Sequence, residues 1–316
     1  MGLLDAFKRA TGPLSRRLAR PAEPAEQLFD EEFQRKLEYL AMVSRRVFSG
    51  AMRAERRTKK TGSGVEFADH RDYAPGDDFR HLDWHAYQRF DRLLLRLFEE
   101  EEDLSIYLIL DNSLSMGFGD GAKLRYAKQL CAALAYVGLA NLDRVAIVTA
   151  NDEISGRMRP TRGKARIFRV FRFLEDVEAD GATALAASLK TFAAQHKRRG
   201  LAVLLSDLYD PEGFDKGINV LRYNKFEPFV LHLIDRRERS PALAGDLRLH
   251  DCETGQGRDV TVTAKVLARY AEAYDRHLAE ARQYCVSKQV SYFPADLTIP
   301  FDELILRVFR KGGFIR

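Results

Sequence analysis

Hydrophobic runs of strand length alternate with amphipathic stretches of helix length from residue 104 onward. Continuous apolar runs predict strands buried on both faces at 104–110, 144–149, 201–206 and 228–234. Apolar residues at helical spacing predict helices at 122–142, 163–177, 184–197 and 211–223. The residues after Asn151-Asp152 indicate an antiparallel edge strand at 154–160. This order predicts an α/β fold with a doubly wound, mostly parallel sheet.

The pattern changes at both ends of this region. Two short strand-like runs at 246–251 and 258–263 flank Glu253-Thr254-Gly255-Gln256-Gly257, which predicts a small β-hairpin insertion near 246–263. We expect the rest to be a long helix, a strand and a last helix, at 264–288, 290–293 and 301–310. Ahead of residue 104, acids in the first turn and arginines in the last predict a helix at 30–48.

The first 28 residues differ in composition from the rest. Leucines mix with basic residues over 1–20, which predicts either a basic amphipathic helix that contacts an anionic membrane surface or a solvated terminus. The Pro-rich stretch at 21–26 indicates a stiff linker. We therefore expect a basic segment and linker at 1–28, a region with an N-terminal helical and loop extension at 29–100, and the α/β domain at 101–316.

Composition narrows the class of protein. Of 316 residues, 46% are hydrophobic, which is enough for a globular core. The net charge is +5 with acids and bases mixed, so only the basic run at 53–60 leaves nucleic-acid binding open, against a solvated loop. Three cysteines without metal or redox spacing, no secretory signal and no membrane-length apolar stretch predict a cytoplasmic protein, with peripheral contact at the inner membrane surface left open for residues 1–20.

Oxygen-bearing side chains follow two of the predicted buried strands. Asp111, Ser113 and Ser115 come directly after the first strand, and Asp207 follows the third. Thr183 lies in a Gly-containing turn just before a predicted helix. Parallel strands place their carboxyl ends at one edge of a sheet, so we expect these side chains to meet there. Carboxylates and hydroxyls are the ligands that Mg²⁺ or Mn²⁺ prefers.

Each signal also has an ordinary interpretation. Asp and Ser are favoured in solvated turns and at helix N-termini, and Asp210 lies close to Asp207 in the same loop. In their order along the chain, the three loops resemble the von Willebrand factor A domain, a Rossmann-like fold with a metal-ion-dependent adhesion site (MIDAS). The resemblance implies that Mg²⁺ (or Mn²⁺ or Ca²⁺) binds these residues, and that an acidic side chain of a protein partner fills its open position.

A second unusual stretch lies between residues 61 and 84. Arginines, aspartates and aromatic residues interleave there around a Pro-Gly-Asp-Asp turn, and the candidate residues are Arg71, Tyr73, Asp77, Asp78, Arg80, Asp83 and Trp84. This mixture indicates a structured ionic network that fixes a loop against the sheet edge through buried salt bridges. The alternative is that its aspartates contact a partner or a second cation.

The same block carries the second resemblance. Its Gly-x-Gly, Glu-Phe, Arg-x-Tyr-x-Pro-Gly-Asp-Asp-x-Arg and Asp-Trp pattern, followed by Asp-x-Ser-x-Ser, resembles the family called domain of unknown function 58 (DUF58). The resemblance covers roughly residues 30–310. It implies a protein that accompanies MoxR-type AAA+ ATPases and has no assigned catalytic activity.

Together these patterns predict a metal-dependent protein–protein interaction module rather than an enzyme. The resemblance implies an adaptor or chaperone-like partner of a MoxR-type AAA+ ATPase. One alternative is a phosphate-handling hydrolase of the haloacid dehalogenase kind, which requires an acid two residues after the strand-end aspartate, where Ser113 stands. The other is a nucleic-acid-binding module that uses the basic run at 53–60.

Overall fold

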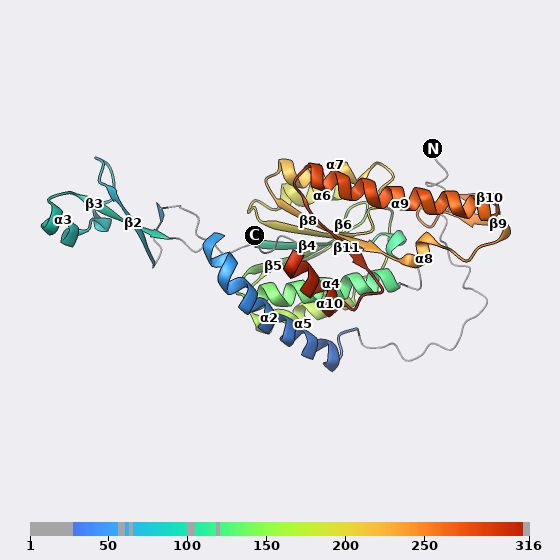
Figure 1. Cartoon of the computed structure of the whole chain (residues 1–316), viewed down its shortest axis with the longest axis horizontal. Helices are drawn as coiled ribbons and strands as arrows, with labels where there is room; N and C mark the ends of the chain where they lie inside the picture. The colour runs from blue at the N-terminus through green and yellow to red at the C-terminus, as the bar shows by residue number, and fades with distance from the viewer. Residues whose placement is uncertain (1–27, 56–60, 63–65, 100–104, 118–120, 312–316) are drawn as a thin grey trace. The chain divides into compact units, whose positions relative to one another are not determined.

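The computed structural model describes residues 28–55, 61–62, 66–99, 105–117 and 121–311 (Figure 1). Contacts divide these residues into a larger unit, which contains 28–44 and 105–311, and a smaller unit between residues 45 and 99. The predicted basic segment at 1–20 and its linker lie outside the described residues, as do residues 56–60 of the basic run. The domain boundaries expected at 28/29 and 100/101 stay predictions.

The larger unit is built on a six-stranded, mostly parallel sheet. Its strands, in spatial order, are β11 (Ser291–Asp296), β8 (Glu227–Ile234), β7 (Leu201–Ser206), β4 (Ser105–Asp111), β5 (Arg144–Ala150) and β6 (Ile154–Thr161). All neighbours are parallel except β6, which runs antiparallel to β5 at the edge. Every residue of β4 and β7 is buried, as expected of strands covered on both faces. The predicted strands and the antiparallel edge are confirmed.

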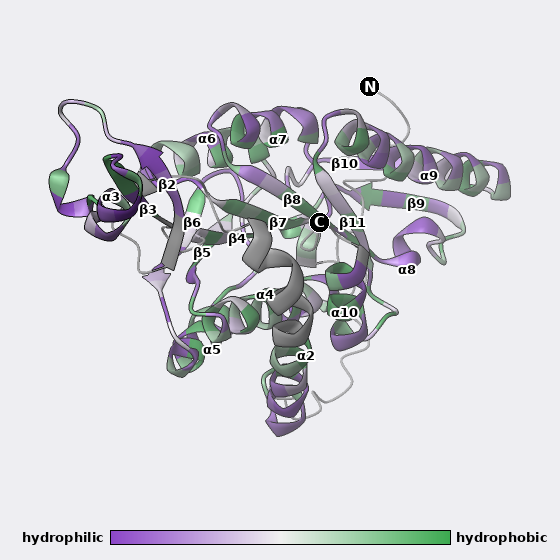
Figure 2. Ribbon diagram, turned by 60° about the vertical axis from the view of Figure 1, so that its left-hand side comes forward, coloured by the Kyte–Doolittle hydropathy of each residue, from purple (hydrophilic) through white to green (hydrophobic). Residues whose placement is uncertain are grey.

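Helices cover both faces of this sheet (Figure 1). On one face lie α4 (Ala122–Ala140), α5 (Ile167–Glu175), α10 (Phe301–Lys311) and the first half of α2 (Glu31–Glu55); on the other lie α6 (Leu185–Gln195), α7 (Phe214–Tyr223) and α9 (Ala264–Ser287). Phe33 of α2 packs on Phe171 and Phe301, which places the start of that helix in the larger unit. Figure 2 shows the central strands coloured as hydrophobic and the helices as mixed, which is the pattern of a two-sided core.

The predicted hairpin insertion is confirmed as a separate two-stranded sheet of β9 (Gly245–His250) and β10 (Gly257–Val262). Leu249 of β9 and Tyr270 of α9 form the buried centre of a small apolar cluster that also includes Leu247 and Val260. This cluster is distinct from the main core between the sheet and α6, α7 and α9. The hairpin is therefore held by its own packing on α9.

The smaller unit is a three-stranded antiparallel sheet, ordered β1 (Thr61–Gly62), β3 (Leu94–Glu99) and β2 (Glu66–Asp72). It also contains the 3₁₀ turn η2 (Phe79–His81) and the short helix α3 (Trp84–Phe90). Sequence patterning missed these strands because β2 alternates charged residues and has no continuous apolar run. Helix α2 extends to Glu55, past the predicted end at 48, so the basic run begins inside a helix.

None of the helices in the described ranges is both long enough and apolar enough to cross a bilayer. Cys131 and Cys285 are buried and Cys252 is half-buried, and all three are free thiols. Thiols packed in this way behave as small hydrophobic side chains.

Candidate functional site

The candidate site lies where β4 and its parallel neighbour β7 end. The register pairs Leu110 with Leu205, so the residues that follow, Asp111 and the Ser206-Asp207 pair, emerge side by side. A third loop joins them, because the Leu114 amide donates to the Gly181 carbonyl at 3.0 Å. The sheet topology therefore brings the three predicted loops to one edge, as parallel strands do.

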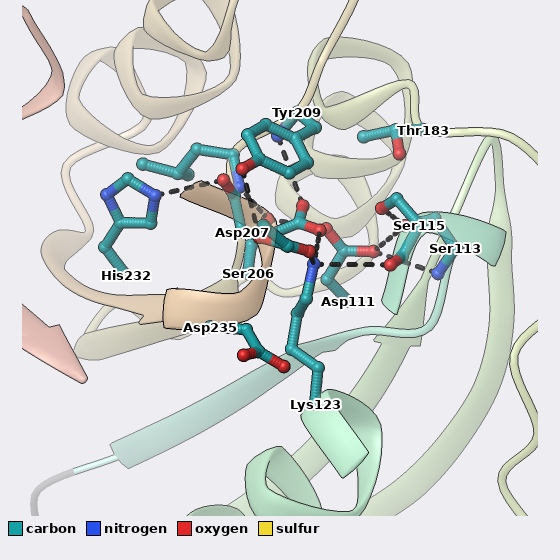
Figure 3. Close-up of polar contacts among 12 residues, drawn as sticks. Asp111, Ser113, Ser115, Lys123, Thr183, Ser206, Asp207, Tyr209, His232 and Asp235 are labelled. Atoms are coloured by element: carbon teal, nitrogen blue, oxygen red, sulfur yellow. Dashed lines mark hydrogen bonds and ion pairs between the residues drawn. The ribbon is translucent and has the colours of Figure 1, made fainter. Parts of the chain in front are cut away.

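Asp111, Ser113 and Ser115 form a compact oxygen cluster (Figure 3). Both the Ser113 amide and its hydroxyl donate to Oδ1 of Asp111, at 3.0 and 2.6 Å. The two serine hydroxyl oxygens lie 3.0 Å apart. Adjacent ligands of an octahedral Mg²⁺ at about 2.1 Å from the metal are separated by about 3.0 Å, so this spacing fits that ion. Ser206, which sequence reasoning missed, donates to the other Asp111 oxygen at 2.5 Å.

Asp207 is fully buried and its orientation is fixed by the backbone around it. Leu208, a buried non-glycine residue, has a φ of 59°, and the Ser206 hydroxyl accepts a hydrogen bond from its amide. Such a φ is unfavourable for a branched side chain and is retained only where surrounding contacts require it. His232 also fixes the turn, because its Nε2 donates to the Asp207 carbonyl at 3.0 Å. Asp210 instead accepts from the Leu185 amide at the start of α6.

A buried lysine that the sequence did not single out lies beside Asp207. Lys123, from the first turn of α4, donates from Nζ to Oδ2 of Asp207 at 2.7 Å and to the Ser115 carbonyl at 3.3 Å. Its ammonium also pairs with Glu238 of the short helix α8 (Arg236–Arg239), whose other oxygen accepts from the Tyr209 hydroxyl. Figure 3 shows Lys123 rising from α4 toward the aspartates. One ammonium thus neutralises part of the charge of Asp207 and Glu238.

The charges of this buried group shift its protonation. Burial, with the neighbouring Asp207 charge, raises the pKa of Asp111 to about 7. Burial also acts to raise the pKa of Asp207, but the charge and hydrogen bond of Lys123 outweigh it and hold that pKa below its ordinary value. Burial raises the pKa of Glu238. Lys123 pairs with Asp207 and Glu238 rather than with Asp111, so an added cation beside Asp111 would favour the ionised form of that carboxyl.

Thr183, the fifth predicted residue, is buried and contacts the inserted hairpin. Its hydroxyl donates to Oε1 of Glu253 at 2.7 Å, and its amide donates to Oε2 at 3.1 Å. Figure 3 shows the threonine hydroxyl on the side of Ser115. Burial is the main cause that raises the pKa of Glu253. A carboxylate of this chain therefore binds one of the residues expected to hold the metal.

The donor set decides which metals suit the site. No group of three or more His, Cys, Asp or Glu side chains converges as a metal site in the part of the chain that the structure describes. A metal here would depend on the hydroxyls of Ser113, Ser115 and Thr183 as well as on carboxylates. Oxygen-only donors with a low carboxylate count fit Mg²⁺ or Mn²⁺, which retain water ligands, better than Zn²⁺.

The Arg-Asp block lies in the smaller unit, and its ion pairs are internal to that unit. Arg71 pairs with Asp77 at 2.8 Å, and Asp77 also accepts from the Ala74 amide. Arg80 contacts Asp78 with its guanidinium at 2.7 Å. The Tyr73 amide donates to the carbonyl of residue 93 at 2.9 Å, which continues the pairing of β2 with β3 past Asp72. These contacts form the predicted ionic network, but most of its members are exposed rather than buried.

Asp83 is the most heavily bonded member of the block. It accepts from the amides of His85 and Ala86 at the start of α3, and from the side chains of His70 on β2 and Arg96 on β3. The hydrogen bonds of Arg96 and then His70 hold its pKa far below its ordinary range. Trp84, by contrast, is exposed and packs edge-on against Tyr87. Asp83 therefore has a structural role as the helix cap that also joins two strands.

Sequence reasoning missed Lys123, Ser206, Glu238 and Glu253. Lys123 follows ordinary helix-start residues, and Glu238 lies in the charged run Arg236-Arg237-Glu238-Arg239, which is typical of solvent-exposed sequence. Ser206 closes an apolar run, where the sequence indicates only the end of a strand. No local signal marks these residues, because their roles depend on contacts between distant positions. The separation is 84 positions for Lys123–Asp207, 95 for Asp111–Ser206 and 70 for Thr183–Glu253.

The fold and this edge define an α/β protein with a hydroxyl and carboxylate site at the strand ends. The chain belongs to the family described as "Protein of unknown function DUF58", whose profile matches residues 69–280. That match spans both the Arg-Asp block and the strand-end site. It confirms the family predicted from the Pro-Gly-Asp-Asp pattern.

Similar proteins include uncharacterized protein Rv1480 of Mycobacterium tuberculosis, 23% identical over 256 residues, which cover 79% of this chain and 80% of that protein. Among solved structures, the conserved hypothetical protein BatB from Bacteroides thetaiotaomicron is 13% identical and covers 66% of this chain and 100% of that one, with a TM-score of 0.38. An aerotolerance-related membrane protein from Bacteroides fragilis is 15% identical, with 66% and 99% coverage and the same score. Scores at this level assign neither fold nor function.

Proposed function

We propose that the chain is a metal-dependent protein–protein interaction module with a doubly wound, von Willebrand A-like sheet. The observation that carries the proposal is the convergence of the Asp111 carboxylate with the Ser113 and Ser115 hydroxyls beside the buried Asp207. Ser113, Ser115 and Thr183 would hold Mg²⁺, with Asp111 and Asp207 balancing its charge directly or through water. The bound ion would supply an electrophilic position for a carboxylate of a partner.

We also propose that the site is not catalytic. Both oxygens of the Asp111 carboxylate accept hydrogen bonds from groups of this chain, which leaves it poorly placed to attack phosphate. The residue two positions on is Ser113, which lacks the acidity to protonate a leaving group. Recognition needs neither a free nucleophile nor a general acid, so it agrees better with these contacts.

The proposed partner is a MoxR-type AAA+ ATPase, for which this chain would be an adaptor or chaperone-like component. This assignment depends on the resemblance of the Pro-Gly-Asp-Asp pattern to DUF58. The matching profile supports membership of that family and does not bear on the ATPase. The chemical requirement that the site adds is an exposed acidic side chain on the partner.

The test is Mg²⁺ binding by isothermal titration calorimetry with the Asp111→Ala protein. We expect that loss of this carboxylate weakens Mg²⁺ binding at least about 100-fold, because it removes both the main charge and the hydrogen bonds that orient Ser113. Asp176→Ala, at an exposed aspartate after α5, is the matched control and should bind as the unmodified protein does. Equal Mg²⁺ binding by all three proteins would contradict the proposal.

The partner is tested with the purified MoxR-type ATPase of the same organism. Because AAA+ proteins themselves use Mg²⁺ with ATP, a chelator would disturb both proteins. The comparison is therefore made at constant Mg²⁺, with unmodified, Asp111→Ala and Asp176→Ala proteins. Binding that Asp111→Ala alone abolishes supports the adaptor role, and binding that survives it contradicts a metal-mediated contact.

A further inference from the structure

The turn of the β9–β10 hairpin places a carboxylate at the candidate metal site. Glu253 receives two hydrogen bonds from Thr183, one from its hydroxyl and one from its amide. The Thr183 hydroxyl oxygen and Oε1 of Glu253 lie 2.7 Å apart, close to the separation of about 3.0 Å expected of adjacent ligands around one Mg²⁺. Glu253 therefore lies next to Thr183, one of the proposed metal ligands, and reaches it from the hairpin turn.

The turn itself holds Glu253 in place. Asp251 accepts from the Glu253 amide at 2.9 Å and from the Thr254 hydroxyl at 2.7 Å, and the Gly255 amide donates to the Asp251 carbonyl. These contacts fix the backbone on both sides of the glutamate. The side chain reaches Thr183, 70 residues away in the sequence, from a preorganised turn.

Charge around Glu253 also favours a cation. The Glu253 carboxylate accepts hydrogen bonds from the neutral hydroxyl and amide of Thr183, and it lies within electrostatic reach of Asp207 and Asp251. A half-buried carboxylate with only neutral donors is costly to ionise, and a bound cation beside it would compensate that cost. The hairpin thus brings a further carboxylate to a site that already contains those of Asp111 and Asp207.

We propose that Glu253 is this chain's own acidic ligand for the metal site, in the coordination position that a partner's carboxylate would otherwise take. This inference rests on the proposed function of the same site. The β9–β10 hairpin packs on α9 through its own small cluster around Leu249 and Tyr270, apart from the main core, so it can withdraw as a unit without opening the sheet. A partner would then bind only after the hairpin releases the site.

The experiment compares the full chain with Glu253→Gln and with Asp259→Asn. Gln keeps an acceptor for the Thr183 hydroxyl but is a poor Mg²⁺ ligand. Asp259 lies exposed on β10 of the same hairpin, so Asp259→Asn removes one negative charge from the same element. Two measurements are made on each protein: Mg²⁺ affinity by calorimetry, and amide hydrogen exchange of residues 245–262 with and without Mg²⁺.

We expect Mg²⁺ to slow exchange across the hairpin of the unmodified and Asp259→Asn proteins, since the metal links Glu253 to the strand-end loops. In Glu253→Gln, Mg²⁺ affinity should fall about tenfold and the added protection should disappear. Mg²⁺ binding that is lost in Asp111→Ala but unchanged in Glu253→Gln, with the hairpin equally protected, overturns this inference and leaves the proposed function standing. No Mg²⁺ binding by the unmodified protein overturns both.

Discussion

At the residue scale, Lys123 has the most unusual environment in the larger unit. Its side chain is fully buried, and its ammonium lies between the carboxylates of Asp207 and Glu238 and over the Tyr209 ring. Burial alone would lower the pKa of this lysine, but the two carboxylates outweigh it and keep the group charged. Lys123 therefore supplies the positive charge that allows these acids to be buried near the site.

Replacing Lys123 with Met should lower the free energy of unfolding by about 3 to 5 kcal/mol, because two buried carboxylates would lose their shared cation. Urea unfolding followed by circular dichroism measures the change. Lys190→Met, at an exposed lysine of α6, should stay within about 0.5 kcal/mol of the unmodified protein. The double variant Lys123→Met/Glu238→Gln should recover part of the loss. A loss below about 1 kcal/mol in Lys123→Met would show that the buried carboxylates of Asp207 and Glu238 do not depend on Lys123 for their stability.

At the scale of elements, the close approach of β4 and β7 sets the positions of Asp111 and Asp207. Gly200, just before β7, lies so near the start of β4 that a Cβ added to it would come within 2.1 Å of the Ser105 carbonyl oxygen. This oxygen is part of the backbone and cannot move aside as a flexible side chain can. The absence of a side chain at Gly200 is therefore a condition for the pairing that brings the two aspartates together.

Gly200→Ala should lower the free energy of unfolding by at least about 2 kcal/mol, because the two strands must separate at that end. Thermal or urea unfolding gives the value. Gly117→Ala is the matched control, since its added Cβ would meet only the Ala179 Cβ at an ordinary 3.4 Å. Equal stability of the two variants would mean that the backbone just before β7 can shift without cost.

At the scale of the whole molecule, the chain consists of two compact units with different sources of order. The larger unit is stabilised by a buried core on both faces of its sheet. The smaller unit is stabilised by a short sheet, the helix α3 and ion pairs such as Arg96–Asp83. Trp84 is the chain's single tryptophan and lies in the smaller unit, directly after Asp83. Its fluorescence therefore follows that unit alone, while circular dichroism in the helical region mostly follows the larger one.

Acid should unfold the smaller unit through Asp83. The folded state lowers the pKa of this carboxyl, so the unfolded state binds its proton more tightly, and the stability that Asp83 supplies is present above about pH 4 and lost as the pH falls below it. Urea midpoints from Trp84 fluorescence should fall between pH 7 and pH 3. Asp83→Asn should start lower at pH 7 and depend less on pH, whereas Asp72→Asn, at an exposed pair with Arg92, should behave as the unmodified protein does. An unchanged pH dependence in Asp83→Asn would assign the acid response to another group.

The sequence by itself determined the alternation of elements in the larger unit and the chemistry available at the strand ends. Hydrophobic periodicity depends only on neighbours along the chain, so the strand of Asp111, the strand of Asp207 and the hairpin that carries Glu253 were all predictable. The small sheet was not, because β2 is mostly charged and has no continuous apolar run, and Arg96 interrupts the apolar residues of β3.

Only the tertiary structure decided the composition of the candidate site. Lys123 and Glu238 come from helix surfaces that look solvent-exposed in sequence. Lys123 pairs with both Asp207 and Glu238 because α4 and α8 pack near the end of β7. Glu253 meets Thr183 through a contact that spans 70 residues. Side-chain pairing over such separations depends on how helices and loops pack on the sheet, and this packing is a property of the whole fold that no local pattern records.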